Sequence, residues 1–200
     1  TVFVNDSLGN YGQNSISFTI DLINPNINIT FPTSNNTNSS NTGLDVNVSV
    51  SDTVGLGTCY YSNDTYSINT QFGCATGVNI TTVTWSEGKH NITVYVNDSS
   101  NNTNSSSISF TIDLTSPTVT IRSPEFNQTN SSNTNLDINF TFSDLATAIE
   151  SCWYSNDTYL INRSTPCGTN LTNITWSAGL HNVTVFVNDS LGNYGQNSIS

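Results

Sequence analysis

The sequence contains few charged residues, and basic residues are the scarcest of all. Three Lys and Arg residues accompany 14 Asp and Glu residues among 200, which gives a formal net charge of −11 and a pI near 4.1. A chain of this charge has no basic surface that could hold a phosphate backbone or an anionic lipid headgroup. The composition therefore excludes nucleic acid as a partner and predicts no membrane contact by this segment.

Long apolar runs and the common catalytic motifs are also missing. No stretch approaches the roughly 18 apolar residues of a membrane-spanning helix, and no signal peptide is visible. The sequence has no Gly-rich phosphate loop, no G-x-S-x-G motif and no Met, and its few basic groups leave little for catalysis. We therefore expect no enzyme activity and no cofactor, unless Ca²⁺ is counted as one.

The sequence does contain a domain-sized repeat. Residues 1–17 return letter for letter as residues 184–200, and a weaker copy, TVYVNDSSNNTNSSSISFTID, spans residues 93–113. The motifs FTIDLINP (18–25) and FTIDLTSP (110–117) recur at the same point of each unit and indicate linkers. We expect residues 1–21 to be the last two strands of a preceding module, 22–113 a first module, and 114–200 a second module truncated at its last strand. The strands missing from the first fragment would come from upstream or from another copy, because a lone hairpin is marginally stable in water.

Apolar and polar residues alternate in several short segments, which is the period of half-buried β-strands. One such segment carries Leu44, Val46, Val48 and Val50, and residues 27–31, 92–96, 108–112 and 136–142 show the same period. No helical period of comparable length occurs. The sequence therefore predicts an all-β fold, in which each module is an antiparallel β-sandwich of six to seven strands. The middle strands of each unit are expected to end at Trp85 and Trp176.

Four cysteines form two pairs with identical spacing. Cys59 and Cys74 fall in the first unit, and Cys152 and Cys167 fall in the second. The pattern indicates one disulfide in each module, and a zinc site is the poorer alternative because no C-x-x-C motif occurs and the two histidines lie far along the chain. A disulfide implies an oxidising, extracellular compartment.

One longer motif resembles a known family. The run G-x-H-x-V-T-V-x-V-x-D-x-x-G-N in residues 179–193, together with F-T-I-D-x-x-x-P at the module boundary, is similar to the tandem bacterial and archaeal immunoglobulin-like domains of large cell-surface proteins and adhesins. The resemblance covers essentially the whole chain and implies modules joined end to end. Two features differ from the family pattern. The middle copy reads Asp98-Ser-Ser-Asn-Asn in place of D-x-x-G-N, and the disulfide lies within one half of the module.

Three acidic residues are expected to meet at the incoming end of each module. Adjacent strands alternate in direction, so the second and sixth strands both end where the linker arrives. The expected groups are Asp21, Asp52 and Asp98 in the first unit and Asp113, Asp144 and Asp189 in the second. Clustered hard oxygen ligands suit Ca²⁺, which would stiffen the linker. The alternative is that these residues only satisfy local backbone groups in turns.

N-glycosylation sequons are about twice as frequent as the composition predicts. Twenty Asn-x-Ser/Thr sequons occur, against about nine expected by chance. Those in predicted strands fall on the outward phase, although polar residues face outward in any case. The excess favours a heavily N-glycosylated surface and an archaeal envelope over most bacterial ones. The sequon asparagines are Asn5, Asn28, Asn35, Asn38, Asn47, Asn63, Asn79, Asn91, Asn97, Asn101, Asn104, Asn127, Asn130, Asn139, Asn156, Asn162, Asn170, Asn173, Asn182 and Asn188.

These features together predict a mechanical role. We expect a repeat segment of a long, N-glycosylated extracellular fibre or filament on the cell surface, whose partners are its own glycans and other copies of the repeat, head to tail or laterally. Repetition favours reach and stiffness over catalysis. The alternative is an adhesin or a carbohydrate-binding array. Aromatic residues that would serve such binding or lateral contacts are Tyr60, Tyr61, Tyr66, Tyr95, Trp153, Tyr154, Tyr159 and Phe186.

Overall fold

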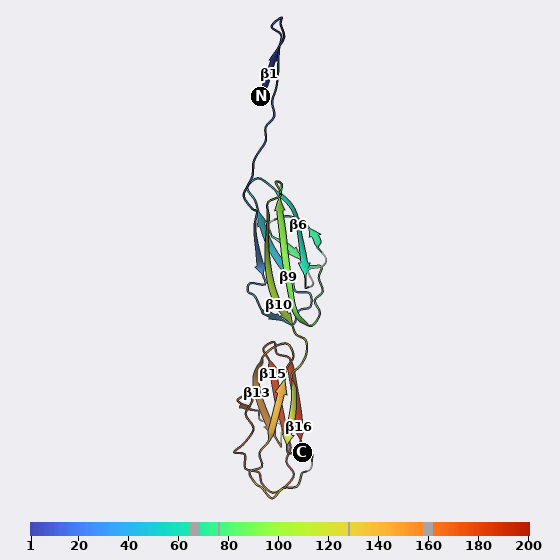
Figure 1. Ribbon diagram of the computed structural model, residues 1–200. Coiled ribbons are helices and arrows are strands. Elements are labelled where there is room, and N and C mark those ends of the chain that lie inside the picture. Colours follow the sequence, from blue (N-terminus) through green and yellow to red (C-terminus); the bar gives the residue numbers. More distant parts are fainter. Residues whose placement is uncertain (65–68, 76, 128, 158–161) are drawn as a thin grey trace.

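The computed structural model of the chain is all-β and elongated. It describes residues 1–64, 69–75, 77–127, 129–157 and 162–200. A hairpin of β1 (Val2–Asn5) and β2 (Tyr11–Asn14) projects at one end, followed by two β-sandwiches joined end to end (Figure 1). The predicted all-β sandwich fold is therefore confirmed. Among the described residues, no helix has the length and apolar character to cross a membrane.

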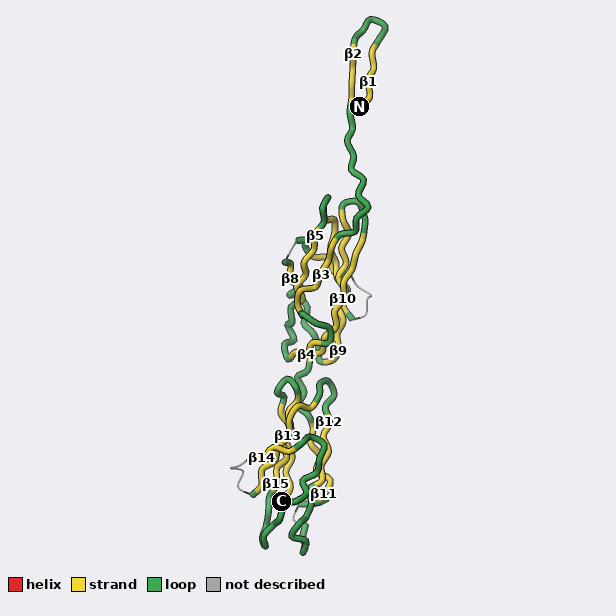
Figure 2. Tube along the Cα trace, turned by 90° about the vertical axis from the view of Figure 1, so that its left-hand side faces the viewer, coloured by secondary structure: helices red, strands yellow, loops and turns green. Residues whose placement is uncertain are grey.

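The first sandwich contains two facing sheets. One holds β3, β5 and β8, and the other has the order β4-β10-β9-β6-β7 (Figure 2). Its strands are β3 (Asn26–Phe31), β4 (Thr37–Ser39), β5 (Val46–Ser51), β6 (Leu56–Asn63), β7 (Thr70–Phe72), β8 (Val78–Ile80), β9 (Gly88–Asp98) and β10 (Thr103–Ile112).

The core of the first sandwich comes from the predicted alternation. Val46, Val48 and Val50 of β5 face Val94 and Val96 of β9, and all five are almost fully buried. Burying a side chain of this size stabilises the fold by about 1.5–3 kcal/mol. The outward positions between them carry Asn47 and Ser49 in β5 and Tyr95 in β9, so short strands with little apolar content still close a core.

The second sandwich repeats this plan with fewer strands. Its sheets are the pair β11-β12 and the four-stranded order β14-β13-β15-β16. A single bridge between Ile138 and Leu171 extends the smaller sheet. The strands are β11 (Thr118–Ser123), β12 (Asn139–Ser143), β13 (Ile149–Asn156), β14 (Arg163–Thr165), β15 (Val183–Asp189) and β16 (Tyr194–Ile199).

Two details of the predicted sandwich are wrong. Among the described residues the first sandwich has eight strands, one more than the upper expectation, and it is not wholly antiparallel. The chain crosses between the sheets after β3, and β4 then pairs in parallel with β10, Phe110 lying opposite Thr37. β3 and β4 therefore belong to opposite sheets, and β4 is a strand that alternation did not predict.

Two expectations from alternation also fail locally. Phe31 was expected to face inward with Ile27 and Ile29, yet it is 38% exposed because the register shifts between Ile29 and Phe31. The middle strand was expected to end at Trp85, but β8 ends at Ile80. Trp85 instead packs from a loop, with its ring edge against Phe110 and its Nε1 donating to the Leu44 carbonyl at 2.9 Å.

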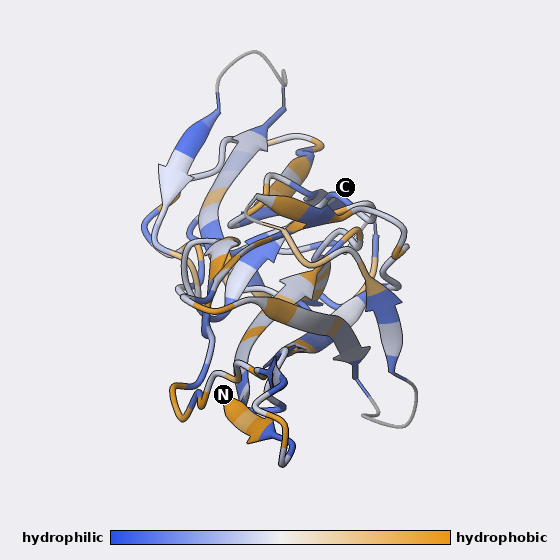
Figure 3. Ribbon diagram, turned by 90° about the horizontal axis from the view of Figure 1, so that it is seen from above, coloured by the Kyte–Doolittle hydropathy of each residue, from blue (hydrophilic) through white to orange (hydrophobic). Residues whose placement is uncertain are grey.

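The N-terminal hairpin shows what β15 and β16 look like without a sandwich. Val2 and Val4 are 75% and 67% exposed, whereas Val185 and Val187, their counterparts in the identical C-terminal copy, are each 1% exposed. In the view along the long axis, β1 appears as an apolar strand beside the N-terminus (Figure 3). The same sequence therefore forms the same hairpin in both places, but only the second copy packs into a core.

Candidate metal centres

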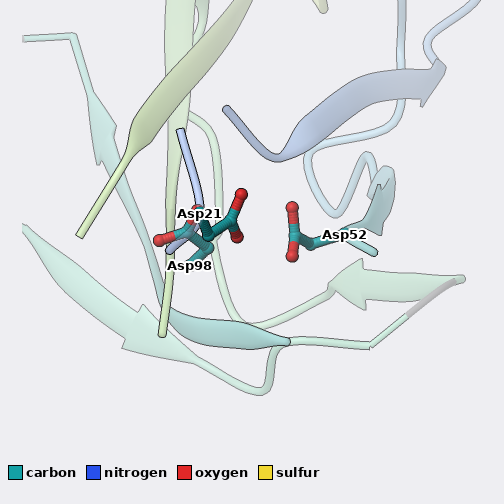
Figure 4. A group of neighbouring side chains, drawn as sticks. All are labelled: Asp21, Asp52 and Asp98. Atoms are coloured by element: carbon teal, nitrogen blue, oxygen red, sulfur yellow. The ribbon is translucent and has the colours of Figure 1, made fainter. Parts of the chain in front are cut away.

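The first candidate centre lies at the incoming end of the first sandwich. Asp21 belongs to the incoming linker, Asp52 follows β5, and Asp98 is the last residue of β9. Leu56, at the start of β6, pairs with Asp98, so the loop after β5 and the end of β9 meet at one pole. One carboxylate oxygen from each Asp lies within 4.8 Å of the other two, and Figure 4 shows the three groups facing a common space.

The second candidate centre repeats this arrangement in the second sandwich. Asp113 directly follows β10, Asp144 follows β12, and Asp189 ends β15. Their oxygens also lie within 4.8 Å of one another. Asp113 is thus attached to the last strand of the first sandwich while its carboxylate sits among groups of the second. The structure therefore brings together both predicted sets of three acids.

Turn chemistry, the alternative explanation, is present as well. Asp52 Oδ1 accepts hydrogen bonds from the amides of Val54 at 2.8 Å and Gly55 at 2.9 Å. These bonds, with that from Gly55 the strongest, lower the pKa of Asp52. Asp98 Oδ1 likewise accepts from the amides of Ser100 and Asn102. Each acid therefore holds its own turn with one oxygen, which orients the other oxygen.

Local hydrogen bonds do not account for all of these carboxylates. Asp98 is 1% exposed, Asp113 and Asp189 are 0% exposed, and Asp21 is 9% exposed. Two enclosed oxygens, Asp21 Oδ2 and Asp144 Oδ2, have no hydrogen-bond partner. Among the described residues no Lys or Arg forms an ion pair with either set. Neighbouring carboxylates at this separation repel one another, so each centre favours a cation.

Asp189 shows how the protein keeps one of these acids ionised. Burial raises the pKa of Asp189, but the side-chain amide of Asn193 and the backbone amides of Leu191 and Asn193 together lower the pKa below its ordinary value. Asn193 Nδ2 donates to Asp189 Oδ2 at 2.8 Å, and Asn102 Nδ2 makes the same bond to Asp98 Oδ2 at 2.7 Å. The sequence reasoning did not single out these asparagines, although their position four residues after the Asp was a readable signal.

The disulfides join the pairs expected from their spacing. Cys59 is linked to Cys74 and Cys152 to Cys167. Cys59 lies in β6 and Cys74 just beyond β7, so the bond staples two neighbouring strands at the edge of one sheet. It does not connect the two facing sheets.

Comparison with known proteins finds a family similarity in the second sandwich. Residues 117–185 match the family model described as a bacterial Ig domain. This part of the chain is therefore similar to a bacterial Ig domain. The first sandwich has the corresponding three acids, disulfide and Trp, so the two sandwiches are Ig-like domains in tandem. No curated protein sequence matches the chain.

Several solved structures are similar to these Ig-like domains in tandem. Fibronectin(III)-like modules of CbhA from Clostridium thermocellum share 16% identity at a TM-score of 0.42, over 86% of this chain and 90% of that one. A tetra-tandem repeat from the extending region of a large adhesion protein shares 17% identity at 0.40, over 98% of this chain and 53% of that one. A 1.5-MDa bacterial ice-binding adhesin shares 15% identity at 0.41, over 88% of this chain and 63% of that one.

The apparent departure at Asp98 disappears in the structure of the Ig-like domains. In the D-x-x-G-N copies, Gly9 and Gly192 have φ of 83° and 85°, and in the middle copy Asn101 has φ of 68° at the same position. Asn tolerates the left-handed region better than other side chains, so the turn keeps its shape. Asn102 can then reach Asp98 as Asn193 reaches Asp189.

Two histidines have structural positions in the Ig-like domains. His90 Nε2 lies 2.7 Å from the Ser86 carbonyl and its Nδ1 3.0 Å from Asp64 Oδ2. His181 makes the equivalent contacts to Ser177 and Asp157. The Ser177 carbonyl and then the Asp157 carboxylate raise the pKa of His181 above 6.5. His90 also packs on Trp85 and His181 on Trp176, which suits a corner that ties the loop to the core.

The sequon asparagines are exposed to different degrees. None of the twenty is buried, but Asn47, Asn63, Asn91, Asn97, Asn139, Asn156, Asn182 and Asn188 are only half-exposed. The Oδ1 atoms of Asn47 in β5 and of Asn182, just before β15, are enclosed without a hydrogen-bond partner, so these two positions are less open than alternation predicts. More accessible sequon asparagines are Asn35, Asn38, Asn101, Asn104, Asn127 and Asn130.

The candidate aromatic residues divide into core and surface groups. Tyr61 is buried in the first core and is therefore unavailable for binding. On the outer face of the larger sheets, Tyr60 stacks on Tyr95 at 4.9 Å and Trp153 on Phe186 at 5.6 Å. Tyr66 and Tyr159 lie outside the described residues. The two stacked pairs hold equivalent positions, because β6 pairs with β9 as β13 pairs with β15.

Proposed function

We propose that the chain is a structural repeat segment of a long extracellular surface protein, in which each Ig-like domain is a rigid spacer. The observation that carries this proposal is the end-to-end arrangement of two sandwiches, whose linkers arrive and leave at opposite poles (Figure 1). Each added domain then lengthens the array, whereas one catalytic site would suffice without repetition. Ig-like repeats of this kind are typically non-enzymatic modules.

Three further features support an extracellular and mechanical role. The two disulfides suit an oxidising compartment. The net charge of −11 keeps neighbouring segments soluble and disfavours nucleic-acid and anionic-membrane partners. Each core is closed within one sandwich, so a domain transmits force through its short linkers.

We extend the proposal to a glycosylated filament. The open loop sequons, among them Asn35, Asn101 and Asn127, would carry N-glycans that shield the polar surface, as suits an archaeal envelope. Other copies of the repeat would be the main partners, head to tail along the fibre and laterally through the stacked aromatic pairs. Intact-mass measurement of the protein from its native source tests the glycans, and a mass equal to that of the bare chain would contradict this extension.

Small-angle X-ray scattering tests the spacer role on the full chain. Strands of six to ten residues plus a linker predict an axial rise of roughly 35–45 Å per domain. We expect a rod-like scattering profile that lengthens by this amount when a further repeat is added. A profile in which the two sandwiches fold back on each other would overturn the proposal.

Adhesion to a glycan is the second candidate function. The stacked pairs Tyr60–Tyr95 and Trp153–Phe186 lie at the same place on both domains, as an array of weak sugar sites would require. A glycan array probed with the chain and with Trp153→Ala distinguishes the candidates. Glycan binding that is lost in the variant would favour adhesion. If the chain binds no glycan, the aromatic pairs would instead serve lateral contacts between chains.

A further inference from the structure

We propose that Asn97 of the first Ig-like domain carries an N-glycan and that the first sugar of this glycan packs on the stacked rings of Tyr60 and Tyr95. The inference rests on the proposed glycosylated surface and deepens it, because it gives one sequon a structural glycan. Asn188, the counterpart of Asn97 in the second domain, supplies the comparison.

A hollow beside the two rings gives this sugar a place. The lining of the hollow includes Tyr60, Tyr95, Asn97, Thr103 and Ser105. Its volume of about 410 Å³ is at the lower end of the range of about 300–1,000 Å³ that ligand sites occupy, which suits a small group. A pyranose ring has an apolar C–H face that is buried well against an aromatic ring while its hydroxyls stay in water.

The strand register places Asn97 on the same face as the rings. Tyr95 and Asn97 are two residues apart in β9, and side chains alternate between the faces of a strand. Tyr60 of β6 pairs with Tyr95 on one side of β9. On the other side, Thr103 of β10 pairs with Asn97, and Ser105 pairs with Tyr95. A sugar on Asn97 would therefore contact three neighbouring strands at once.

The hydrogen bonds of Asn97 hold its oxygen and leave its nitrogen available. Oδ1 accepts the backbone amide and the hydroxyl of Thr58, both at 2.6 Å. Nδ2 contacts Asn101 Oδ1 at the long distance of 3.5 Å. N-glycosylation substitutes the nitrogen and leaves the oxygen an acceptor, so the attachment preserves the bonds from Thr58.

The attachment is a group transfer from a glycosyl donor of the host, a sugar joined through phosphate to a lipid. Nδ2 of Asn97 forms a bond to C1 of the sugar, and the bond from C1 to the phosphate oxygen breaks. The phosphate leaves with the electron pair, and one amide proton passes to the solvent. Ser99 supplies the third position of the sequon.

The second domain has a third ring where the first has the hollow. Its sequon asparagine, Asn188, pairs with Tyr194, whereas Thr103 occupies that position in the first domain. The ring of Tyr194 lies 5.9 Å from that of Trp153 and 6.0 Å from that of Phe186. A sugar on Asn188 would meet the Tyr194 ring, so we expect this asparagine to stay bare.

A nearby sequon, that of Asn104, is the less suitable attachment point. Asn104 also borders the hollow, but it pairs with Val96, whose side chain is buried in the core. Its Nδ2 donates to the Pro25 carbonyl at 2.9 Å, which directs the nitrogen to the linker. Asn97 is therefore the sequon asparagine that shares its face with the rings.

Glycopeptide mass spectrometry of the protein from its native source measures occupancy. We expect a glycan on Asn97 and a bare Asn188, beside glycans on loop sequons such as Asn35. Loop glycans with Asn97 bare, or no more occupied than Asn188, would overturn this inference and leave the glycosylated filament standing. If no sequon is occupied, both fail, whereas the spacer role needs no glycan and is tested by the scattering length per repeat.

Two serine substitutions test whether the sugar packs on the domain. Ser99→Ala removes the sequon of Asn97 but keeps Asn97 and its bonds to Thr58. Ser190→Ala does the same for Asn188 and is the matched control, since both serines are exposed. In glycosylated full chain, we expect Ser99→Ala to lower the melting temperature of the first domain by about 4–8 °C. We expect Ser190→Ala to leave the second domain unchanged.

The sugar and the rings are separated by two further measurements. In protein from a host that attaches no N-glycans, Ser99→Ala should melt as wild type does. In glycosylated protein that carries Tyr60→Leu, adding Ser99→Ala should no longer lower the melting temperature, because the sugar has lost one aromatic face. An equal shift with and without glycan, or a shift that persists in Tyr60→Leu, would show that the sugar does not pack on the rings.

Discussion

At the scale of the residue, the repeated segments compare one sequence in two environments. Asp6 Oδ1 accepts the amides of Leu8 and Asn10 in the isolated hairpin, and Asp189 makes the same bonds inside the second domain. This turn forms without a surrounding sandwich, so its shape is local. The next glycine, Gly12 in the hairpin and Gly195 in the second domain, has different surroundings in the two copies. Gly195 lies against Pro117, which belongs to another part of the chain.

Substitution of Gly195 tests whether residues distant in the chain restrict this position. A Cβ at Gly195 would lie 1.8 Å from the backbone carbonyl oxygen of Pro117, and backbone cannot move away cheaply. We expect Gly195→Ala to destabilise the second domain by about 1–3 kcal/mol in urea unfolding, as overpacking does. Gly12→Ala is the matched control within the identical segment. Its Cβ would lie 3.5 Å from Val4 Cγ1 and 4.0 Å from the Val4 carbonyl oxygen, both ordinary contacts, so we expect a change within about 0.5 kcal/mol. Equal effects of the two substitutions would contradict the described contact with the linker.

His181 predicts a pH dependence. Its folded-state pKa is raised above 6.5 by the Ser177 carbonyl and the Asp157 carboxylate. A raised pKa stabilises the fold fully below pH 6.5, and the contribution is lost as the pH rises through the folded-state pKa. The stability difference between wild type and His181→Gln should therefore shrink from pH 5.5 to 8.5, measured by urea unfolding of the second domain. A difference that grows with pH would show that the imidazolium is not the stabilising form.

At the scale of the element, periodicity and spacing were sufficient for most strands. Alternation predicted β5, β9, β10 and β15 because each has one face on a core, and the cysteine spacing predicted which strands would be stapled. Alternation did not predict that Phe31 is exposed or that β4 forms a strand. The register shift at Phe31 depends on pairing with Asn47, 16 residues away, and the position of β4 depends on pairing with β10, 73 residues away. A local period reports neither partner.

The disulfide of the second domain gives a prediction at this scale. Cys152 and Cys167 are 15 residues apart, and closing such a loop stabilises a domain by about 3 kcal/mol in the chain-entropy treatment. Replacing both with Ala should lower the melting temperature of the second domain, while the first, which keeps Cys59–Cys74, should melt as before. Differential scanning calorimetry would show one shifted and one unshifted transition. A joint shift would mean that the two cores unfold as one unit.

At the scale of the whole molecule, the linker between the domains determines how far the array can bend. Thr115 of this linker donates from Oγ1 to Glu87 of the first domain and to Asp113 Oδ1 at 3.2 Å. The contact therefore joins the outgoing end of one domain to the acid centre of the next. Few other side chains described at this junction link the two sandwiches.

Thr115→Ala should loosen the array without unfolding it. The contact is exposed and contributes little to stability, but it restrains the linker, so we expect a broader distribution of interdomain distances at an unchanged melting temperature. Spin labels on the two domains and double electron–electron resonance would measure this distribution. Ser116→Ala, an exposed neighbour in the same linker, is the control. An unchanged distribution in Thr115→Ala would show that the bond does not restrain the junction.

The sequence by itself determined the repeat, the strands with one buried face, the cysteine pairs and the meeting of three acids at each incoming pole. These follow from local period, from spacing and from the alternating direction of strands, all of which are readable along the chain. Only the tertiary structure decided which copy of residues 1–17 is buried and that Thr147 contacts the linker residue Asp113. Those outcomes depend on contacts between residues far apart in the chain, so identical segments of sequence lie in different environments.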